Sequence, residues 1–148
     1  MGAPETRICY ERAEPLCRSL NHPRLLYMAL SGQFRYTLMT DELTAAIRIA
    51  KRLHSLAQEQ NDTGLMLGAY GALACTFYFL GEFQTARQHA GRGVLLWRSA
   101  GAQSPTEEYL APIASCLIYG AICERHFGDI ASCRAAPAAR RVSGGYGR

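Results

Sequence analysis

The sequence predicts an all-α protein, an α-solenoid of about three antiparallel helix hairpins. Apolar residues recur every three or four positions through most of the 148-residue chain, which is the period of a helix with one buried face. A six-residue turn pattern also occurs three times, at intervals of 40 and 47 residues, and such periods with two helices each are typical of solenoids. The pattern begins with a turn residue, which is Asp41, Gly81 or Gly128. It ends with a small residue, which is Ala46, Ala86 or Cys133 respectively.

The first helix is expected at about residues 5–20. Pro15 should kink or divide it, because proline removes a backbone donor and clashes with the preceding turn. The apolar side of this helix comprises Ile8, Cys9, Ala13, Leu16, Cys17 and Leu20.

The next two helices are expected at about residues 24–39 and after Asp41, and each has a stripe of apolar residues at helical spacing. The stripes are Leu26, Ala29, Leu30, Phe34 and Leu38, then Leu43, Ala46, Ile47, Ala50, Leu53 and Ala57. A solvated face is expected at Arg48, Lys51, Arg52 and Gln58.

The hairpin at residues 67–97 is the clearest in the chain. Gly81 should end its first helix in a left-handed conformation, which glycine adopts without steric cost. The packing residues of its first helix are Tyr70, Leu73, Ala74, Phe77 and Leu80, and those of its second are Phe83, Ala86, Ala90, Gly93 and Trp97.

The last long helix is expected to begin at the capping sequence of residues 104–107 and to continue to about Phe127. It should bury Leu110, Ile113, Leu117, Gly120 and Ala121. Gly128 and Asp129 are then expected to turn the chain into a further helix, which Pro137 interrupts. The predicted domain is therefore residues 5–133, followed by a disordered basic tail at residues 134–148.

Composition excludes several classes of function. The net charge of +4 belongs to the tail, because four of the sixteen basic residues follow Cys133 and the other twelve balance the twelve acidic ones. Nucleic-acid binding is therefore not expected, although the tail arginines and Tyr146 leave a contact with phosphates and a base open. No apolar run spans a membrane and no secretory signal is present, so we expect a cytoplasmic protein without membrane contact.

No catalytic or cofactor site is expected. The six cysteines favour reduced, packed thiols over disulfides, and Cys123 with His126 would offer a metal only two ligands. The histidines at positions 54, 89 and 126 have no nucleophile and orienting acid at helical spacing, so we expect them to be half-buried or solvated. Glu124 is expected to form a salt bridge with an arginine, and Trp97 and Tyr70 are core anchors or line a ligand surface.

The hairpin at residues 67–97 resembles the tetratricopeptide repeat, whose helix-packing positions are matched by Tyr70, Leu73, Ala74, Phe77, Gly81, Phe83 and Ala86. Residues 5–133 are more similar to the helical-repeat region of large bacterial signalling proteins that also contain an AAA-type ATPase domain and an adenylate or guanylate cyclase-like domain. Segments 10–17, 80–87 and 116–121 carry this likeness, whereas Asp41 departs from the usual turn glycine. The chain has no G-x-x-x-x-G-K-[ST] phosphate loop, so neither activity is expected of it.

The resemblance implies a protein-interaction or regulatory scaffold module that binds a protein, a peptide or another domain of its parent. The alternative is an effector-sensing segment that controls an ATPase or nucleotide cyclase domain of the parent. Apolar stripes left open at both ends favour a fragment of a larger array, with residues 134–148 read in a shifted frame, and predict self-association through the open ends.

Overall fold

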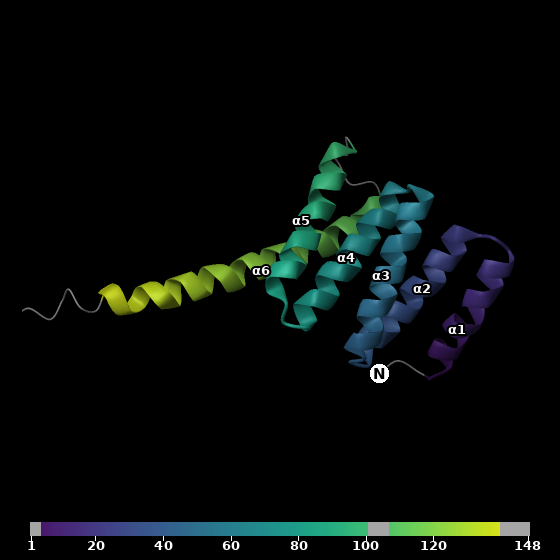
Figure 1. The fold of residues 1–148 in the computed structure, drawn as a ribbon, viewed down its shortest axis with the longest axis horizontal. Helices are drawn as coiled ribbons and strands as arrows, with labels where there is room; N and C mark the ends of the chain where they lie inside the picture. The colour runs from purple at the N-terminus through teal and green to yellow at the C-terminus, as the bar shows by residue number, and fades with distance from the viewer. Residues whose placement is uncertain (1–3, 101–106, 140–148) are drawn as a thin grey trace, which may run out of the picture.

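The computed structural model describes residues 4–100 and 107–139, with side chains described at 5–100 and 111–128. These residues form helices without any strand, so the prediction of an all-α protein is confirmed for the described part of the chain (Figure 1). The helices are α1 (Pro4–Ser19), α2 (Pro23–Met39), α3 (Leu43–Gln60), α4 (Thr63–Phe79), α5 (Phe83–Ser99) and α6 (Glu107–Ala139).

Four turns of the same geometry join α1 to α5. Each turn contains one residue with a left-handed backbone, and these residues lie 20 positions apart: Asn21 (φ 49°), Asp41 (φ 60°), Asn61 (φ 50°) and Gly81 (φ 78°). In each turn the N–H of the left-handed residue bonds to the carbonyl three positions earlier, and the next N–H bonds to the carbonyl five positions earlier. This hydrogen-bond pattern satisfies carbonyls that the helix end leaves without a partner.

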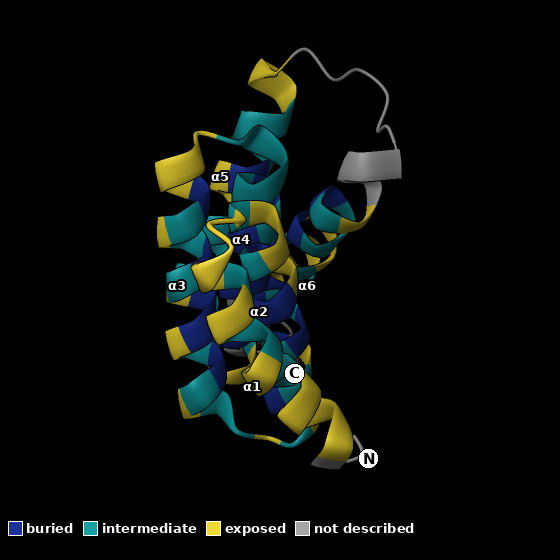
Figure 2. Ribbon diagram, turned by 90° about the vertical axis from the view of Figure 1, so that its right-hand side faces the viewer, coloured by how far each residue is buried: buried dark blue, intermediate teal, exposed yellow. Residues whose placement is uncertain are grey.

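Each helix from α1 to α5 packs against the next helix in the chain, and α6 packs against both α4 and α5. Helix α4 therefore has α3, α5 and α6 as neighbours, and its central part is buried between them. The buried residues, dark blue in Figure 2, lie on the inner sides of the helices. The consecutive residues Gly71, Ala72, Leu73, Ala74, Cys75 and Thr76 are all buried. The predicted stripe of packing residues covered only one face of this helix, whereas buried residues lie on several faces. Leu80, the last predicted packing residue of this helix, is instead 39% exposed.

The structure differs from the prediction at the third occurrence of the turn pattern, at residues 128–133. The expected turn at Gly128 and Asp129 is not formed, because α6 continues as one helix from Glu107 to Ala139. Pro137 lies within this helix, and Pro15 lies within α1 without dividing it. The C-terminal part of α6 extends away from the other helices (Figure 1).

Small residues allow the central helices to approach closely. Ala46, Ala50, Ala57, Ala69, Ala74 and Ala86 are completely buried. Gly93 of α5 faces Cys116 of α6, and a Cβ at position 93 would lie 2.5 Å from the Cys116 Sγ. Larger side chains at these positions would separate the helix backbones and remove the dispersion contacts between them.

Helix α1 forms one end of the molecule and packs against α2 (Figure 1). The ring of Tyr10 lies against Gly32, where it occupies the space that a Cβ would need. Ile8 and Leu16 of α1, and Leu20 directly after it, are exposed by 48%, 63% and 69%. None of the helices in the described ranges combines the length and the apolar content needed to cross a membrane.

Candidate functional site

The predicted packing residues differ in their burial and in the elements to which they belong. Ala46, Leu73, Ala74 and Ala86 are buried, whereas Tyr70, Phe77 and Phe83 are partly buried. Gly81 forms the left-handed turn residue between α4 and α5, whereas Gly128 is exposed within α6. The side chain of Cys133 and the tail from residue 140 onward lie outside the described residues. The buried members of this set hold the helices together.

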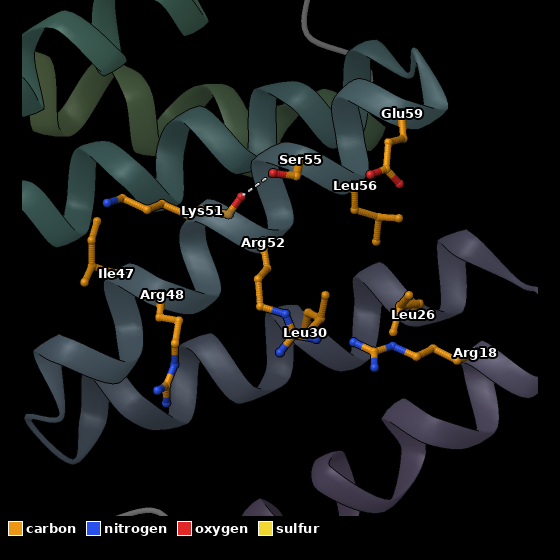
Figure 3. Close-up of a pocket in the computed structure, with 10 residues that line it drawn as sticks. All are labelled: Arg18, Leu26, Leu30, Ile47, Arg48, Lys51, Arg52, Ser55, Leu56 and Glu59. Atoms are coloured by element: carbon orange, nitrogen blue, oxygen red, sulfur yellow. Dashed lines mark hydrogen bonds between the residues drawn. The ribbon is translucent and has the colours of Figure 1, made fainter.

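A groove of about 640 Å³ lies between α1, α2 and α3, and we call it the α3 groove (Figure 3). Its lining consists of four aliphatic residues, four cations, a hydroxyl and a carboxylate: Leu26, Leu30, Ile47, Leu56, Arg18, Arg48, Lys51, Arg52, Ser55 and Glu59. Ligand sites commonly combine an apolar lining with a few convergent polar groups. The α3 groove has this composition, with an excess of positive charge.

Glu14 organises one wall of the α3 groove. Its carboxylate, 16% exposed, lies 2.8 Å from the Arg18 guanidinium, and it accepts hydrogen bonds from Arg52 of α3 and from Gln33 of α2. Burial acts to raise the pKa of Glu14, but the hydrogen bonds from Arg52 and Gln33 together with the positive charge of Arg18 lower it. Glu14 thus stays ionised and fixes two cations beside the aliphatic residues.

The other two cations of the α3 groove have a different environment. Arg48 and Lys51 are exposed, and no carboxylate of the described side chains lies within ion-pair distance of either. A cation without a neighbouring acid keeps its full attraction for an incoming anion. Arg48 and Lys51 are therefore the charges of the groove that remain available to a ligand.

A second hollow, of about 360 Å³, adjoins the α3 groove and shares Lys51 and Ser55 with it. We call it the histidine hollow, because His54 of α3 and His89 of α5 both line it. Its other lining residues are Leu73 and Phe77 of α4 and Arg92 of α5. The hollow thus brings together residues from three helices.

Aromatic rings surround His89. Its imidazole stacks on Phe77 with 5.4 Å between ring centroids and 2° between ring planes, and Tyr70 lies between His89 and His54 at centroid distances of 6.2 Å and 5.4 Å. Burial lowers the pKa of His89, and the positive charges of Arg92 and His54 lower it further. His89 is consequently neutral at pH 7.

A third hollow, of about 330 Å³, lies between α2, α4 and α6. It has one charged lining residue, Arg35, and its other lining residues include Gly68, Gly71 and Cys75. The Tyr27 hydroxyl beside it donates a 2.7 Å hydrogen bond to the Leu65 carbonyl, so this polar group is already satisfied. The third hollow therefore offers fewer groups that bind a ligand than the two along α3.

The other candidate residues form structural contacts. Glu124 lies 3.2 Å from Arg87, as predicted, and His126 stacks on Phe83 with 4.4 Å between centroids. No group of three potential metal ligands occurs among the described side chains. The Cys116 thiol is buried beside the Leu67 carbonyl, and burial raises its pKa to about 11. A thiol with so high a pKa is a poor nucleophile at pH 7.

The sequence correctly predicted a polar face of α3 that carries Arg48, Lys51 and Arg52. It did not predict that these cations line a groove. The groove exists because Arg18 of α1 lies beside α2 and α3, and Glu14 holds Arg18 and Arg52 there; no short motif records an association between helices so far apart in the sequence. The signal in the sequence was the cluster Arg48, Lys51 and Arg52, in which three cations occur within five residues.

Comparison of the chain with protein-family models, with curated proteins and with solved structures found no match.

Proposed function

We propose that this chain is a helical-repeat module of the α-solenoid type that binds an acidic peptide segment of a partner protein in the α3 groove. The groove itself supports this function, because its aliphatic residues lie beside the unpaired cations Arg48 and Lys51 (Figure 3). Such a surface complements a segment that alternates aliphatic and acidic side chains.

The solenoid architecture is supported by the four equal turns. Their 20-residue spacing places one helix and one turn in each unit, so that two units form a 40-residue hairpin repeat. The hairpins would be α2 with α3 and α4 with α5, and α6 would begin a third by packing on α4 and α5. Tetratricopeptide-like repeats combine two helices in this way, and they present extended surfaces to partner proteins.

The nature of the partner follows from the charge and the shape of the groove. A short peptide of about ten residues fits a surface of this extent better than a nucleic acid does, because only two of its cations are free to meet phosphates. The partner segment belongs either to a separate protein or to another domain of the signalling ATPase and cyclase type of parent that the sequence resembles.

A peptide selection tests this function. We expect a displayed library of random 12-residue peptides, selected on the full chain, to yield sequences rich in Leu, Ile, Asp and Glu. The variant Arg48→Glu should lower the affinity for a selected peptide roughly threefold to tenfold, because it removes one attraction and adds a repulsion at the groove rim. Leu56→Gln should weaken the same peptide by removing an apolar contact, with thermal melting as the check that the variant folds.

The matched control is Arg98→Glu, since Arg98 is an exposed arginine at the end of α5 that lines neither the α3 groove nor the histidine hollow. Arg98→Glu should bind the selected peptides as tightly as the unchanged chain. Selection of no peptides, or an equal effect of Arg48→Glu and Arg98→Glu, would contradict peptide binding in this groove.

A further inference from the structure

The histidine hollow is separate in chemistry from the α3 groove. Helices α3 and α5 form its sides, and Leu73 and Phe77 of α4 contribute its apolar surface. Its polar lining consists of two cations, two imidazoles and one hydroxyl, and no carboxylate lines it. The α3 groove in contrast includes Glu59. The hollow therefore presents two cations to an anion with no carboxylate in its lining.

Two cations are available at the rim of the hollow. Lys51 and Arg92 come from different helices, both are exposed, and neither forms an ion pair with a carboxylate in the described ranges. An anion between them would gain two attractions without breaking an existing salt bridge. It would also contribute to holding α3 and α5 in their present arrangement.

The imidazole of His89 adds a hydrogen-bond donor. Its Nδ1 is enclosed and has no partner among the described groups. A neutral imidazole carries one proton, and we place it on Nε2, the nitrogen that is not enclosed. The more accessible side of the ring then carries an N–H, and His89 lines the hollow.

We infer that the histidine hollow binds a small organic monocarboxylate, with the carboxylate between Lys51 and Arg92 and the apolar body against Leu73 and Phe77. The volume of about 360 Å³ accommodates a molecule with one or two rings. Inorganic anions lack the apolar body and would leave the partly buried ring of Phe77 without that contact. The hollow shares Lys51 and Ser55 with the α3 groove, whereas Arg92 lines only the hollow and Arg48 only the groove.

Binding would alter the titration of His89, which supplies a spectroscopic measurement. The charged and titratable groups around its ring are Arg92 on its own helix, Lys51 and His54 on α3, and Tyr70 on α4. The positive charge of Arg92 contributes to the lowered pKa of His89. A bound carboxylate offsets this charge, so the pKa of His89 should rise when the hollow is occupied.

The test is a titration of the full chain, followed by NMR of the histidine side chains, with benzoate as the probe. Benzamide is the neutral control of the same shape, and inorganic phosphate is the anion without an apolar body. We expect benzoate to shift the His89 and His54 signals, to raise the pKa of His89 and to raise the Tm. Benzamide and phosphate should bind at least tenfold more weakly.

Variants assign the effect to the hollow. Arg92→Gln should lower the affinity for benzoate at least fivefold. Arg92→Lys should retain most of this affinity, because the positive charge is kept. The control Arg48→Gln changes a cation that lines the α3 groove and not the hollow, so benzoate should bind it as it binds the unchanged chain.

Three results would overturn the inference: no histidine shift at millimolar benzoate, equal binding of benzamide or phosphate, or equal losses in Arg92→Gln and Arg48→Gln. Peptide binding that survives in Arg92→Gln would leave the proposed function intact in each case. Conversely, loss of peptide binding in Arg48→Glu has no bearing on benzoate in the hollow.

Discussion

At the scale of single residues, two glycines of α5 differ in whether the surrounding structure has room for a side chain. Gly91 and Gly93 are two positions apart in α5 but have opposite surroundings. A Cβ at Gly91 would meet no atom within 4 Å, whereas a Cβ at Gly93 would lie 2.5 Å from the Cys116 Sγ and 3.3 Å from the Tyr70 Cβ. The first glycine is open to substitution, and the second is required by the contact between α5 and α6.

These surroundings predict stability changes of opposite sign. Gly91→Ala should raise the free energy of unfolding by about 0.5–1 kcal/mol, because alanine favours the helix. Gly93→Ala should lower the free energy of unfolding by about 1–3 kcal/mol, because the added methyl group forces α6 away from α5. Urea unfolding of both variants measures the difference. Equal stabilisation by the two substitutions would contradict the close packing of α5 on α6.

Asp62 illustrates how one residue combines a helix cap with an ion pair. Its carboxylate accepts a 3.1 Å hydrogen bond from the Leu65 N–H at the start of α4 and lies 2.9 Å from Arg24 of α2. Burial acts to raise the pKa of Asp62, but the hydrogen bond from Leu65 and the contact with Arg24 outweigh it and lower the pKa.

A lowered pKa makes the contribution of Asp62 to stability dependent on pH. The contribution is complete above the ordinary pKa of an aspartate and is lost as the pH falls through the lower pKa of the folded state. Asp62→Ala should therefore cost about 1 kcal/mol at pH 7 and less near pH 2. Urea unfolding at the two pH values measures this. The control Asp41→Ala changes an exposed turn aspartate without a cap bond and should show a smaller dependence on pH.

At the scale of helices, the chain contains elements that were predictable and elements that were not. The apolar stripes of α2 and α3 were predictable because each helix buries one side, as Leu30, Ala50 and Leu53 show. Helix α4 has neighbours on three sides, and a periodic pattern disappears when every face is buried. The sequence could not show that α6 covers the remaining face of α4.

The two glycines that the sequence placed in turns also differ. Gly81 has a left-handed backbone with a φ of 78°, whereas Gly128 lies within α6. A glycine in a helix interior costs only about 1 kcal/mol relative to alanine, so the local sequence alone does not decide between a turn and a helix.

Alanine substitution separates the two backbone conformations. Gly81→Ala should lower the free energy of unfolding by about 1 kcal/mol, because an L-residue is strained at positive φ. Gly128→Ala should leave stability unchanged or raise it by up to about 1 kcal/mol, and it should increase the helical circular dichroism signal. Destabilisation by Gly128→Ala would instead support the turn predicted from the sequence at this position.

The attachment of α1 depends on Glu14, which bonds to Gln33 of α2 and to Arg52 of α3. Glu14→Ala should lower the hydrogen-exchange protection of α1 by about tenfold, because a hydrogen bond to a charged group contributes about 1.5–3 kcal/mol. Protection in α4 should not change. The control Glu11→Ala removes a carboxylate that is 53% exposed and pairs with Arg7 on the same helix, so its effect should be smaller.

At the scale of the whole molecule, equal turns generate extended surfaces between helices. The turns at Asn21 and Asp41 place α1, α2 and α3 in order, and this order creates the α3 groove. The turns at Asn61 and Gly81 do the same for α3, α4 and α5 around the histidine hollow. The two candidate sites are thus consequences of the regular spacing of the helices.

The candidate sites were less predictable than the helices for a physical reason. Helical periodicity identifies which residues are buried, and it placed Arg48 and Lys51 on a polar face. It does not identify which polar faces lie beside one another after folding. Arg18 and Lys51, or Lys51 and Arg92, become neighbours only when separate helices pack, so a single sequence carries no local signal for either site.

Methyl NMR of the full chain with a selected acidic peptide is the sharpest test of peptide binding in the α3 groove. We expect the methyl signals of Leu26, Ile47 and Leu56 to shift on binding, while those of the exposed residues Ile8, Leu16 and Leu20 do not. Shifts confined to Ile8, Leu16 and Leu20, or no shift at saturating peptide, would contradict it.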